Sequence, residues 1–389
     1  MHKGKLLAGR HLLVIGMALA LVIAVAACGE KAAPAPAPAP APAAKPAPAP
    51  APAPAAKPAP APAPAPAAKP APAPKPVQQP VELRVSHHLS PGYSYSQSLD
   101  KWGDAVEKAT GGKVTVTIYG AQSLIKAKEQ LDAVSKGVVE AAFVPHPYAS
   151  AKVPLLGAAE LPFNFSDYRH MADAANMGLM DLYNKEGFNK INIMEIGETP
   201  INRSGWGTNS TLIKEPKDFD QKIVRVFGAW QAKMIEPLGA KAAWMSSSDI
   251  YTALQRGTVD AYVTTGMSNI PRKLYEVAKT WTAGTIFAGN LGMWINMDAW
   301  NSLTPETQQI LKDLYQDIMV EKQMRIMDTE DFEALELLKD AGLEVYFIND
   351  EEAETVWEAP LSKVKDTFRE ELGPVGVQAL GIIKRAARE

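Results

Sequence analysis

An arginine lies in the middle of an otherwise apolar segment of this chain. Arg225 belongs to the segment 222–227, whose residues after Lys222 are otherwise aliphatic or aromatic, a pattern that predicts a strand. A guanidinium in a low-dielectric place needs an anion, and its parallel donors match the two oxygens of a carboxylate. From the residues alone, that carboxylate belongs either to an acidic side chain of this chain or to a bound molecule.

Polar residues follow this strand at places where they could meet the same ligand. Asp249 precedes the helical segment 250–255 and is a candidate helix cap, and Gly257 ends that helix. Thr264 comes directly after the predicted strand 259–263, where its hydroxyl can donate to an anionic oxygen. This part of the chain is therefore where we expect binding chemistry.

The elements that precede the arginine predict a parallel sheet covered by helices. In order, the patterns are strand 81–85, a helix from Tyr95 that Gly111 ends, strand 113–119, helix 127–136 and strand 141–144. This β-α-β-α-β order is typical of an open α/β fold, which binds ligands at the carboxyl ends of its strands. His88 and the residues 145–148 follow two of those ends.

A second α/β unit is predicted to begin with the strand 191–194. Its further elements are strand 222–227, helix 230–238, helix 250–255 and strand 259–263. A helical pattern from Pro305 towards Ala341 is longer than one globular helix usually is. We therefore expect this long helix to lie across two lobes.

The N-terminus predicts export. Basic residues precede an apolar run from 12 to 27, which is typical of a signal peptide and shorter than the roughly 20 residues of a membrane-spanning helix. The run stops at Cys28, the only cysteine, in a context that resembles a bacterial lipoprotein processing site. We expect residues 1–27 to be removed and Cys28 to be lipidated, with a free thiol as the alternative. A single cysteine excludes an internal disulfide.

A low-complexity segment follows the cysteine. Residues 28–76 consist mainly of Ala-Pro dipeptides with scattered lysines. Proline fixes φ and lacks an amide hydrogen, so the segment favours extended polyproline II. At about 3.1 Å per residue, residues 33–76 would reach at most ~140 Å. We interpret it as a tether between the lipid anchor and a folded domain; a Pro-rich ligand for a partner domain is the alternative.

The remaining domain, residues 77–389, is acidic. The whole chain carries a formal charge of −3 and its first 76 residues carry +7, which leaves −10 for this domain. Its length is enough for two lobes with separate cores. An acidic domain without a basic stripe is a poor partner for nucleic acid, so any bound anion must be held by local donors.

Four stretches of sequence carry a resemblance to a known family. They are residues 83–87, 161–165, 222–226 and 249–260. In this order they resemble the DctP-type solute-binding proteins of tripartite ATP-independent periplasmic (TRAP) transporters, over roughly residues 81–345.

The resemblance implies a fold for the whole domain. That fold is a two-lobed, periplasmic-binding-protein-like α/β fold, in which each lobe has a central sheet flanked by helices, with a hinge and a long helix across both lobes. We expect the first lobe at about 81–200 with 290–325, and the second at about 201–289 with 326–385.

The resemblance also implies roles for single residues. In this family the arginine that matches Arg225 pairs with the substrate carboxylate, and a second arginine often found upstream matches Arg203, for which pairing at the surface or between lobes is the alternative. Thr264 stands where many relatives carry asparagine, and Asp249 stands where glutamate is usual. His88 is expected either to face the cleft or to be a neutral structural histidine.

Aromatic residues near the predicted strand ends could set the specificity. Trp206, Phe227, Trp230, Trp244 and Trp294 fall in these regions, and the loop after Trp244 departs from the Pro-rich pattern of relatives. Our hypothesis is that the carboxylate meets the arginine while the ligand body packs on some of these rings, which favours a larger or less polar acid than a C4-dicarboxylate. Tryptophans also fill cores, and that alternative stays open.

The resemblance implies a binding protein rather than an enzyme. It would capture an organic acid and deliver it to a TRAP membrane permease for ion-gradient-driven uptake, at the periplasm or the outer cell surface. No cofactor or metal is expected, since the adjacent histidines at 87 and 88 point to opposite faces of a strand. A binding protein for a sensor or another transporter type is the alternative; a secreted hydrolase is disfavoured because no Gly-x-Ser-x-Gly motif is present.

Overall fold

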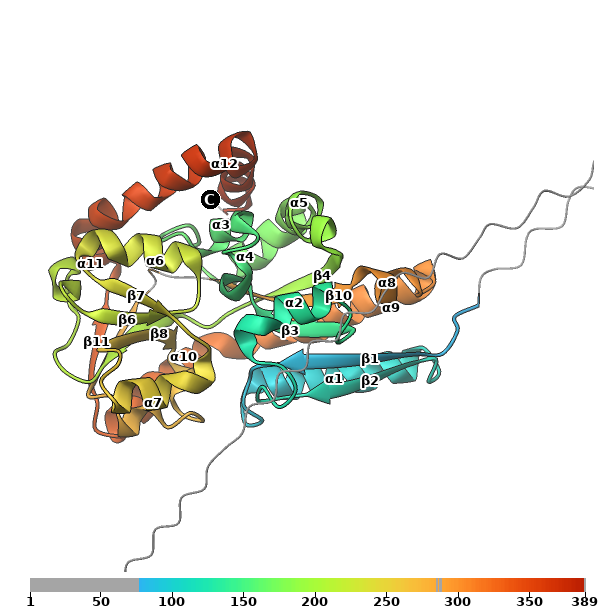
Figure 1. Cartoon of the computed structure of the whole chain (residues 1–389), viewed down its shortest axis with the longest axis horizontal. Helices are drawn as coiled ribbons and strands as arrows, with labels where there is room; N and C mark the ends of the chain where they lie inside the picture. The colour runs from blue at the N-terminus through green and yellow to red at the C-terminus, as the bar shows by residue number, and fades with distance from the viewer. Residues whose placement is uncertain (1–76, 285, 287–288, 388–389) are drawn as a thin grey trace, which may run out of the picture. The chain divides into compact units, whose positions relative to one another are not determined.

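The computed structural model describes residues 77–284, 286 and 289–387 (Figure 1). The predicted signal peptide, the lipidation site at Cys28 and the Ala-Pro tether lie outside the described residues. The described part of the chain contains two β-sheets with helices packed against them. Within this part, no helix combines the length and the apolar character that crossing a membrane would require.

The first sheet has five strands in the order β2-β1-β3-β10-β4. They are β1 (Val81–His87), β2 (Val114–Tyr119), β3 (Ala141–Pro145), β4 (Ile193–Pro200) and β10 (Asn290–Asn296). β1 pairs in parallel with β2 and β3, as the β-α-β-α-β pattern predicts. β10 runs antiparallel between β3 and β4, so the sheet is mixed rather than wholly parallel.

β4 corrects one prediction from the sequence. We expected a strand at 191–194 to open a second α/β unit, but Phe188–Ile191 forms a 3-10 helix and Asn192 adopts a left-handed conformation with φ 61°. Asparagine is one of the few residues that tolerate this conformation, because its short polar side chain can bond locally. The strand therefore begins at Ile193 and pairs with β10 in the first sheet.

The second sheet has six strands in the order β11-β9-β5-β8-β6-β7. They are β5 (Ser204–Thr208), β6 (Ile223–Val226), β7 (Lys241–Trp244), β8 (Ala261–Thr265), β9 (Thr280–Gly284) and β11 (Glu344–Ile348). β6 pairs in parallel with β7 and β8, whereas β5 runs antiparallel to β8 and β9. β6, the strand that carries Arg225, lies between β8 and the edge strand β7. The arginine is therefore on an interior strand of the sheet.

A long helical segment connects the two halves. It comprises α9 (Pro305–Tyr315), the π-helical η11 (Gln316–Lys322) and α10 (Gln323–Asp340). The Thr304 hydroxyl accepts a bond from the Thr307 amide, and the proline at the first helical position needs no partner there. α9 and η11 pack on α1 (Ser94–Ala109) of the first half, and α10 packs on β11 of the second. The predicted helix across both lobes is therefore present.

Short helices connect the remaining strands. They are η1 (Ala127–Glu129), α2 (Gln130–Ser135), η2 (His146–Ala149), η3 (Pro154–Leu156), α3 (Gly157–Glu160), α4 (Tyr168–Ala174), η4 (Ala175–Leu179), α5 (Met180–Glu186), η5 (Phe188–Ile191), η6 (Pro216–Phe219), α6 (Ala229–Ile235), η7 (Glu236–Leu238), η8 (Ser247–Asp249), α7 (Ile250–Gln255), η9 (Met267–Asn269), η10 (Leu274–Glu276), α8 (Met297–Asn301), α11 (Asp350–Glu352) and η12 (Ala353–Trp357).

The C-terminal helix α12 (Glu358–Ala386) contacts elements of both halves, whereas we assigned residues 326–385 to the second lobe alone. It packs against α6, which follows the Arg225 strand, and against α3 and α4, which precede β4 of the first sheet. Phe368 of α12 lies 4.9 Å from the Trp230 ring, edge to face. Gly373 (φ 55°) and Pro374 break the helix, and this kink lets one element follow two surfaces (Figure 1).

The two faces of the second sheet have separate apolar contacts. Trp206 stacks on Trp357 with ring centroids 5.1 Å apart, within the large core that both halves share. Trp281 joins Ile250 and Leu338 in a smaller cluster under α7 and α10. Both tryptophans point into packed interiors, which leaves the strand ends, and not the sheet faces, as places for a ligand.

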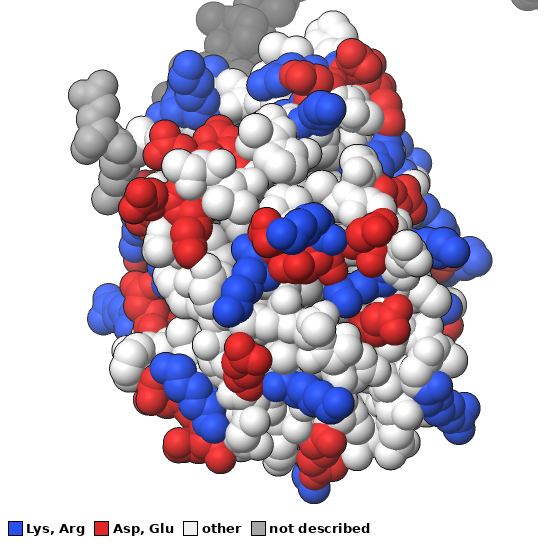
Figure 2. Space-filling view, turned by 90° about the vertical axis from the view of Figure 1, so that its left-hand side faces the viewer, with Lys and Arg blue, Asp and Glu red and all other residues white. Residues whose placement is uncertain are grey.

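Basic and acidic side chains are intermingled on the face shown in Figure 2. Such a surface has no extended field of one sign there. This arrangement agrees with the expectation that an anion is held by local donors.

Candidate functional site

A small cavity of about 20 Å³ lies where strand ends from both sheets meet. Its lining residues are His88, Pro145, Tyr148, Ile201, Arg225, Phe227, Ser247, Thr264, Thr265, Ser268 and Arg272. The first three follow the carboxyl ends of β1 and β3, and the others come mainly from the carboxyl ends of β6 and β8 and the loops behind them. We call this cavity the arginine pocket. It joins four residues named from the sequence: His88, Arg225, Phe227 and Thr264.

Arg225 is buried, with 1% of its surface exposed. Its Nη1 donates to the Val263 carbonyl at 2.7 Å, and its Nε and Nη2 donate to the Met245 carbonyl at 3.1 and 3.0 Å. Nη2 also donates to the Tyr148 hydroxyl at 2.8 Å. Burial lowers the pKa of Arg225, but a guanidinium remains charged at every physiological pH.

Neutral oxygens bond the Arg225 guanidinium without neutralising it. In the described part of the chain, the arginines with a carboxylate within ion-pair distance are Arg84, Arg169, Arg203 and Arg369, and Arg225 is not among them. An internal salt bridge, the alternative that the sequence left open, is therefore absent from this conformation. A buried and uncompensated positive charge is costly, and a bound anion would remove that cost.

Tyr148 links the two halves at the arginine. Its hydroxyl accepts from Arg225 and also from the backbone N–H of Ser247, at 3.0 Å. The oxygen is thus occupied as an acceptor, and its own proton remains to be donated. The Tyr148 ring lies 5.3 Å from the Phe227 ring, which itself lies 4.8 Å from the Arg225 guanidinium carbon. The sequence directed attention to residues 145–148 but did not single out this tyrosine.

A second arginine, which the sequence analysis missed, lines the same pocket. Arg272 follows η9 and is partly buried. It donates to the carbonyls of Ser268 at 3.4 Å and His88 at 3.3 Å, and to the Ser247 hydroxyl at 3.3 Å. Burial lowers its pKa, and the positive charge of Arg225 acts in the same direction. No local pattern marks this position, because only the fold brings the loop to the strand ends.

His88 and Thr264 complete the polar lining. Burial, followed by the charges of Arg272, His87 and Arg225, lowers the pKa of His88 far below its usual value, so the ring is neutral at pH 7. Its Nδ1 is buried without a hydrogen-bond partner. Thr264 is buried on β8 opposite Gly205. A neutral imidazole and a hydroxyl can each donate one hydrogen bond to an anionic ligand.

Asp249 lies close to the arginine pocket but does not line it. Its carboxylate lies 3.4 Å from Lys126 Nζ. Lys126 precedes η1 in the first half and Asp249 ends η8 in the second, so this ion pair connects the two halves. The predicted cap is absent: Asp249 precedes α7, but its side chain makes no capping hydrogen bond. Burial lowers the pKa of Arg225, and the charge of Asp249 opposes this lowering only after a larger opposing effect of Tyr148.

Arg203 points away from the arginine pocket. Its guanidinium lies 3.7 Å from an oxygen of Asp328 and 3.9 Å from one of Asp331, both on α10. Its guanidinium carbon is 5.7 Å from the centre of the Tyr168 ring. All three charged residues belong to the second half, and the Arg203 side chain is 35% exposed, so this is the surface pairing that the sequence left open as one alternative.

Most of the aromatic residues named from the sequence lie away from the pocket. Trp244 is on the edge strand β7 and is 48% exposed, so its ring does not line the cavity. Trp206, Trp230 and Trp294 are almost fully buried in packed interiors. Of the five rings only Phe227 lines the pocket, because an edge strand and a core both direct side chains away from the strand ends.

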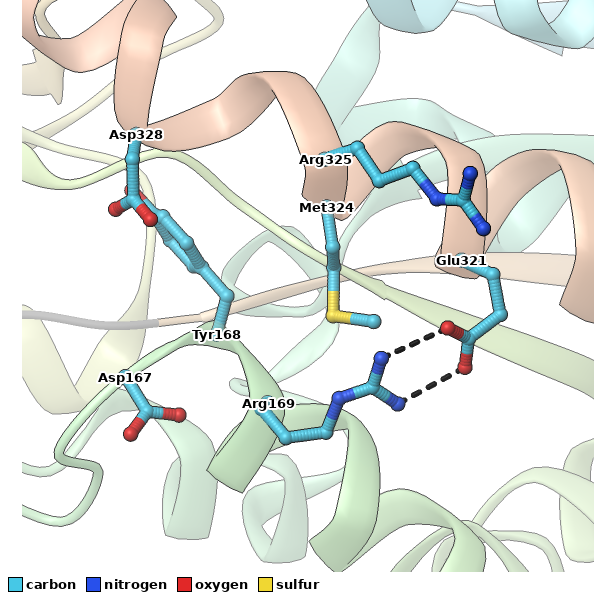
Figure 3. A pocket seen from close by; sticks show the side chains of 7 residues that line it. All are labelled: Asp167, Tyr168, Arg169, Glu321, Met324, Arg325 and Asp328. Atoms are coloured by element: carbon cyan, nitrogen blue, oxygen red, sulfur yellow. Dashed lines mark hydrogen bonds and ion pairs between the residues drawn. The ribbon is translucent and has the colours of Figure 1, made fainter.

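A larger and more open cavity lies between α4 and the η11–α10 helix (Figure 3). It measures about 420 Å³, and its lining residues are Asp167, Tyr168, Arg169, Glu321, Met324, Arg325 and Asp328. Arg169 donates two bonds to Glu321, at 2.9 and 2.7 Å. Because this guanidinium already has a carboxylate and Arg325 is exposed, the cavity lacks the buried, uncompensated cation of the arginine pocket.

A cluster of His146, Glu195 and Glu198 is buried in the first half. One possible ligand atom of each residue lies within 4.8 Å of the others, a spacing that would suit a metal ion. The nearest pair, His146 Nε2 and Glu195 Oε1, is already hydrogen-bonded at 2.5 Å. Burial raises the pKa of Glu195, and raises that of Glu198 to about 8. We therefore interpret this group, the acidic cluster, as a network that holds protons.

Known proteins are similar to this chain in sequence. The family model for bacterial extracellular solute-binding protein, family 7 (DctP) matches residues 85–371. The C4-dicarboxylate-binding periplasmic protein DctP of Rhodobacter capsulatus is 26% identical over 324 residues, which cover 80% of this chain and 92% of that protein. A monocarboxylate 2-oxoacid-binding periplasmic protein of Nostoc sp. is 28% identical over 217 residues, which cover 53% of this chain and 57% of that protein.

Solved structures share the fold. A TRAP periplasmic solute-binding protein from Desulfovibrio salexigens with bound orotic acid superposes with a TM-score of 0.73 at 22% identity, covering 78% of this chain and 98% of that one. One from Rhodoferax ferrireducens with bound malonate gives 0.72 at 20% identity with the same coverage. The predicted two-lobed α/β fold is confirmed. Since the family model spans well over half of the sequence, this chain belongs to the bacterial extracellular solute-binding proteins of family 7.

Proposed function

We propose that this protein captures an organic acid in the arginine pocket and delivers it to the membrane permease of a TRAP transporter. The observation that carries the proposal is Arg225, a buried cation with no carboxylate within ion-pair distance in the described chain. Membership of family 7 supports the transport role. Relatives named for C4-dicarboxylates and for 2-oxoacids support carboxylates as the ligand class.

The proposed capture uses donors from both halves. Arg225 and Thr264 come from the second half, whereas Tyr148 and His88 come from the first. A ligand that enters between the halves would bind one set first, and closure would then add the other set and exclude water. Charge-assisted hydrogen bonds strengthen as the local dielectric falls, so closure and tight binding are coupled.

No chemical conversion is part of this function. The pocket offers hydrogen-bond donors, and its histidine is neutral at pH 7 because burial lowers its pKa. We expect an acid that enters the pocket to be released unchanged. Lipidation at Cys28 and the Ala-Pro tether would hold the domain near the membrane, within ~140 Å of the anchor.

Calorimetry on an Arg225→Ala variant tests the proposal. The probes are malonate, succinate, pyruvate and glucuronate, together with any acid that native mass spectrometry finds on protein purified from cells. We expect Arg225→Ala to weaken binding at least tenfold, because the pocket loses its fully buried cation. Arg256→Ala, at an exposed arginine of the same half, is the matched control and should bind as the native protein does. Unchanged affinity in Arg225→Ala would show that the arginine is structural.

A further inference from the structure

We infer that His146, Glu195 and Glu198 form a binding site for one divalent transition-metal ion, such as Zn²⁺ or Mn²⁺. This site is separate from the proposed function, because the acidic cluster does not line the arginine pocket. The protons assigned to the cluster above are those that it holds when no metal ion is bound. The kinds of donor atom, the buried polar atoms without partners and the balance of charge carry the inference.

The donor atoms of the cluster are those that a transition metal takes. One imidazole nitrogen with two carboxylates suits Zn²⁺, Mn²⁺ or Fe²⁺, whereas Ca²⁺ and Mg²⁺ prefer oxygen ligands alone. One candidate atom from each residue lies within 4.8 Å of the other two. Two ligands of the same zinc ion, each at about 2.1 Å from it, lie at most roughly 4.2 Å apart. Small side-chain movements would therefore bring all three residues onto one ion.

Each of the three side chains is buried with one polar atom unused. His146 Nδ1, Glu195 Oε2 and Glu198 Oε1 have no hydrogen-bond partner among the described residues. The side chains of His146 and Glu195 are fully buried, and Glu198 is 4% exposed. Buried polar atoms without partners are rare in native proteins, and a bound ion is one of the few explanations for them. Three such atoms in one cluster therefore point to a ligand.

Two neighbouring side chains orient the carboxylates. Trp294 Nε1 donates to Glu195 Oε1 at 3.0 Å. Asn290 Nδ2 donates to Glu198 Oε2. Outer hydrogen bonds of this kind hold metal-binding carboxylates in place. Oδ1 of the same Asn290 amide is buried and has no partner in the described part of the chain, so it is available as a neutral fourth ligand.

Gly292 of β10 leaves room for these donors. A Cβ there would overlap Glu195 Oε1 and Trp294 Nε1, and it would lie 2.9 Å from His146 Nε2. The backbone of β10 therefore passes directly beside the donor atoms. β10 lies between β3 and β4, with His146 at the end of β3 and both glutamates on β4. A metal ion here would join β3 to β4 across the strand that separates them.

One divalent ion would balance the charge of the cluster. Two ionised carboxylates and a neutral imidazole carry −2 together, so a divalent cation makes the buried group neutral. Among the described residues, the ion-pair partner of Glu195 is His146, and no lysine or arginine pairs with Glu198. Buried carboxylates are tolerated where they are paired or coordinate a metal. The chain supplies no cation of its own, and a metal ion would supply one.

Metal content and melting temperature of the full-length protein test the site. Protein is purified from cells grown with added Zn²⁺, with added Mn²⁺ or with neither, dialysed against EDTA and analysed by plasma mass spectrometry. Because the site is buried, we expect about one equivalent of one metal to survive dialysis. We expect the metal-loaded protein to melt at least about 4 °C higher than the protein grown without metal.

Variants of the two glutamates locate the ion. Glu195→Gln and Glu198→Gln keep the side-chain shape, and we expect each to retain less than about 0.2 equivalents and to lose the metal-dependent melting shift. Glu198→Asp keeps the carboxylate and should recover part of the metal content. Glu129→Gln, at an exposed glutamate of the same half, is the matched control and should retain as much metal as the native protein.

Two outcomes would overturn the inference. If the native protein retains less than about 0.2 equivalents of either metal, the cluster holds protons alone. If both glutamine variants retain as much metal as the native protein, the ion lies elsewhere on the chain. Circular dichroism spectra that match the native spectrum exclude misfolding as the cause of metal loss in a variant. Neither outcome bears on the proposed function, which calorimetry at the arginine pocket tests separately.

Discussion

The arginine pocket and the acidic cluster bury charged groups in opposite ways. The pocket collects Arg225 and Arg272 without a carboxylate, and the cluster collects Glu195 and Glu198 around His146. A carboxylate that loses its hydration can take up a proton, because burial raises its pKa into the accessible range. A guanidinium cannot discharge in this way, because its pKa starts above 12.

The consequence is a difference in role. Burial raises the pKa of Glu198 to about 8, so this residue holds a proton at neutral pH, and the pKa of His146 is lowered so that its ring stays neutral. The cluster thus lowers its own charge by holding protons, although His146 Nδ1, Glu195 Oε2 and Glu198 Oε1 are buried without a hydrogen-bond partner among the described residues. The pocket keeps its charge at every accessible pH, and neither of its arginines has a carboxylate within ion-pair distance in the described part of the chain. The predictions below test this separation, from the largest expected effect to the smallest.

Removal of the central acceptor in the acidic cluster should have the largest effect. Glu195 Oε1 lies 2.5 Å from His146 Nε2 and accepts from Trp294 Nε1 at 3.0 Å. Glu195→Ala would leave these buried groups unpaired and open a cavity, which we expect to cost about 3 kcal/mol of unfolding free energy. Urea denaturation measures the loss. Ligand affinity should stay within twofold of the native value.

Glu195→Gln is the matched control for this prediction. It preserves the shape of the side chain and an oxygen acceptor, so its cost should be less than about 1.5 kcal/mol. A tenfold loss of ligand affinity in either variant would show that the cluster and the pocket are coupled, contrary to the comparison.

The pH dependence of stability should identify the proton held by the cluster. Glu198 has a folded-state pKa of about 8, above the usual value of a glutamate, so the folded state binds this proton more tightly than the unfolded state. Its contribution to stability is therefore full below the unfolded pKa and is lost as the pH rises through about 8. One such group changes the free energy of unfolding by at most about 1.4 kcal/mol per pH unit.

Glu198→Gln mimics the protonated form and should remove this contribution. Denaturation curves at pH 5, 6, 7 and 8 for the native protein and the variant give the difference in slope. Histidines away from the cluster are present in both proteins and cancel in that difference. Glu198 interacts with His146, so the difference in slope reports the proton of this coupled pair. Parallel slopes between pH 5 and pH 8 would show that Glu198 is ionised in the folded protein.

Two aromatic variants separate the pocket from its surroundings. Phe227 lines the pocket beside the Arg225 guanidinium, whereas Trp244 is exposed on an edge strand. We expect Phe227→Ala to weaken the binding of an organic acid up to tenfold, because cation–π and packing contacts are lost. Trp244→Ala should change the affinity for the same acid less than twofold. Calorimetry with one acid on both variants checks this. A larger effect at Trp244 would restore the hypothesis that its ring packs on the ligand.

Arg203 should give the smallest effect, because its charge is already compensated. It pairs with Asp328 and Asp331 in a partly exposed position. Arg203→Gln should therefore cost less than about 1 kcal/mol of stability and change ligand affinity less than twofold. Binding and melting measurements on the same preparation test both values. A tenfold loss of affinity would mean that Arg203 reaches the ligand in another conformation of the halves.

Much of the fold could be predicted because its signals are local. Strand β2 alternates at period two and helix α1 repeats at helical spacing, so residues a few positions apart determine both. The boundary at Asn192 and the antiparallel insertion of β10 could not be predicted in the same way, because pairing between strands far apart in the sequence decides them.

The residues of the candidate site also differ in whether a local sequence signal identifies them. Arg225 was identifiable because a charge inside an apolar strand stands out in a few residues. The sequence did not identify Arg272 or Tyr148 and did not predict where Trp244 lies. Loops and edge strands carry no periodic signal from which such positions could be predicted.

The sequence by itself determined that residues 77–389 form an α/β domain with a cation in a strand and a net negative charge. Only the tertiary structure decided which groups meet that cation: it paired Arg203 with aspartates, left Arg225 without one and placed Arg272 beside it. The physical reason is that the cost of a buried charge depends on every group within a few ångströms, and the fold alone sets those neighbours.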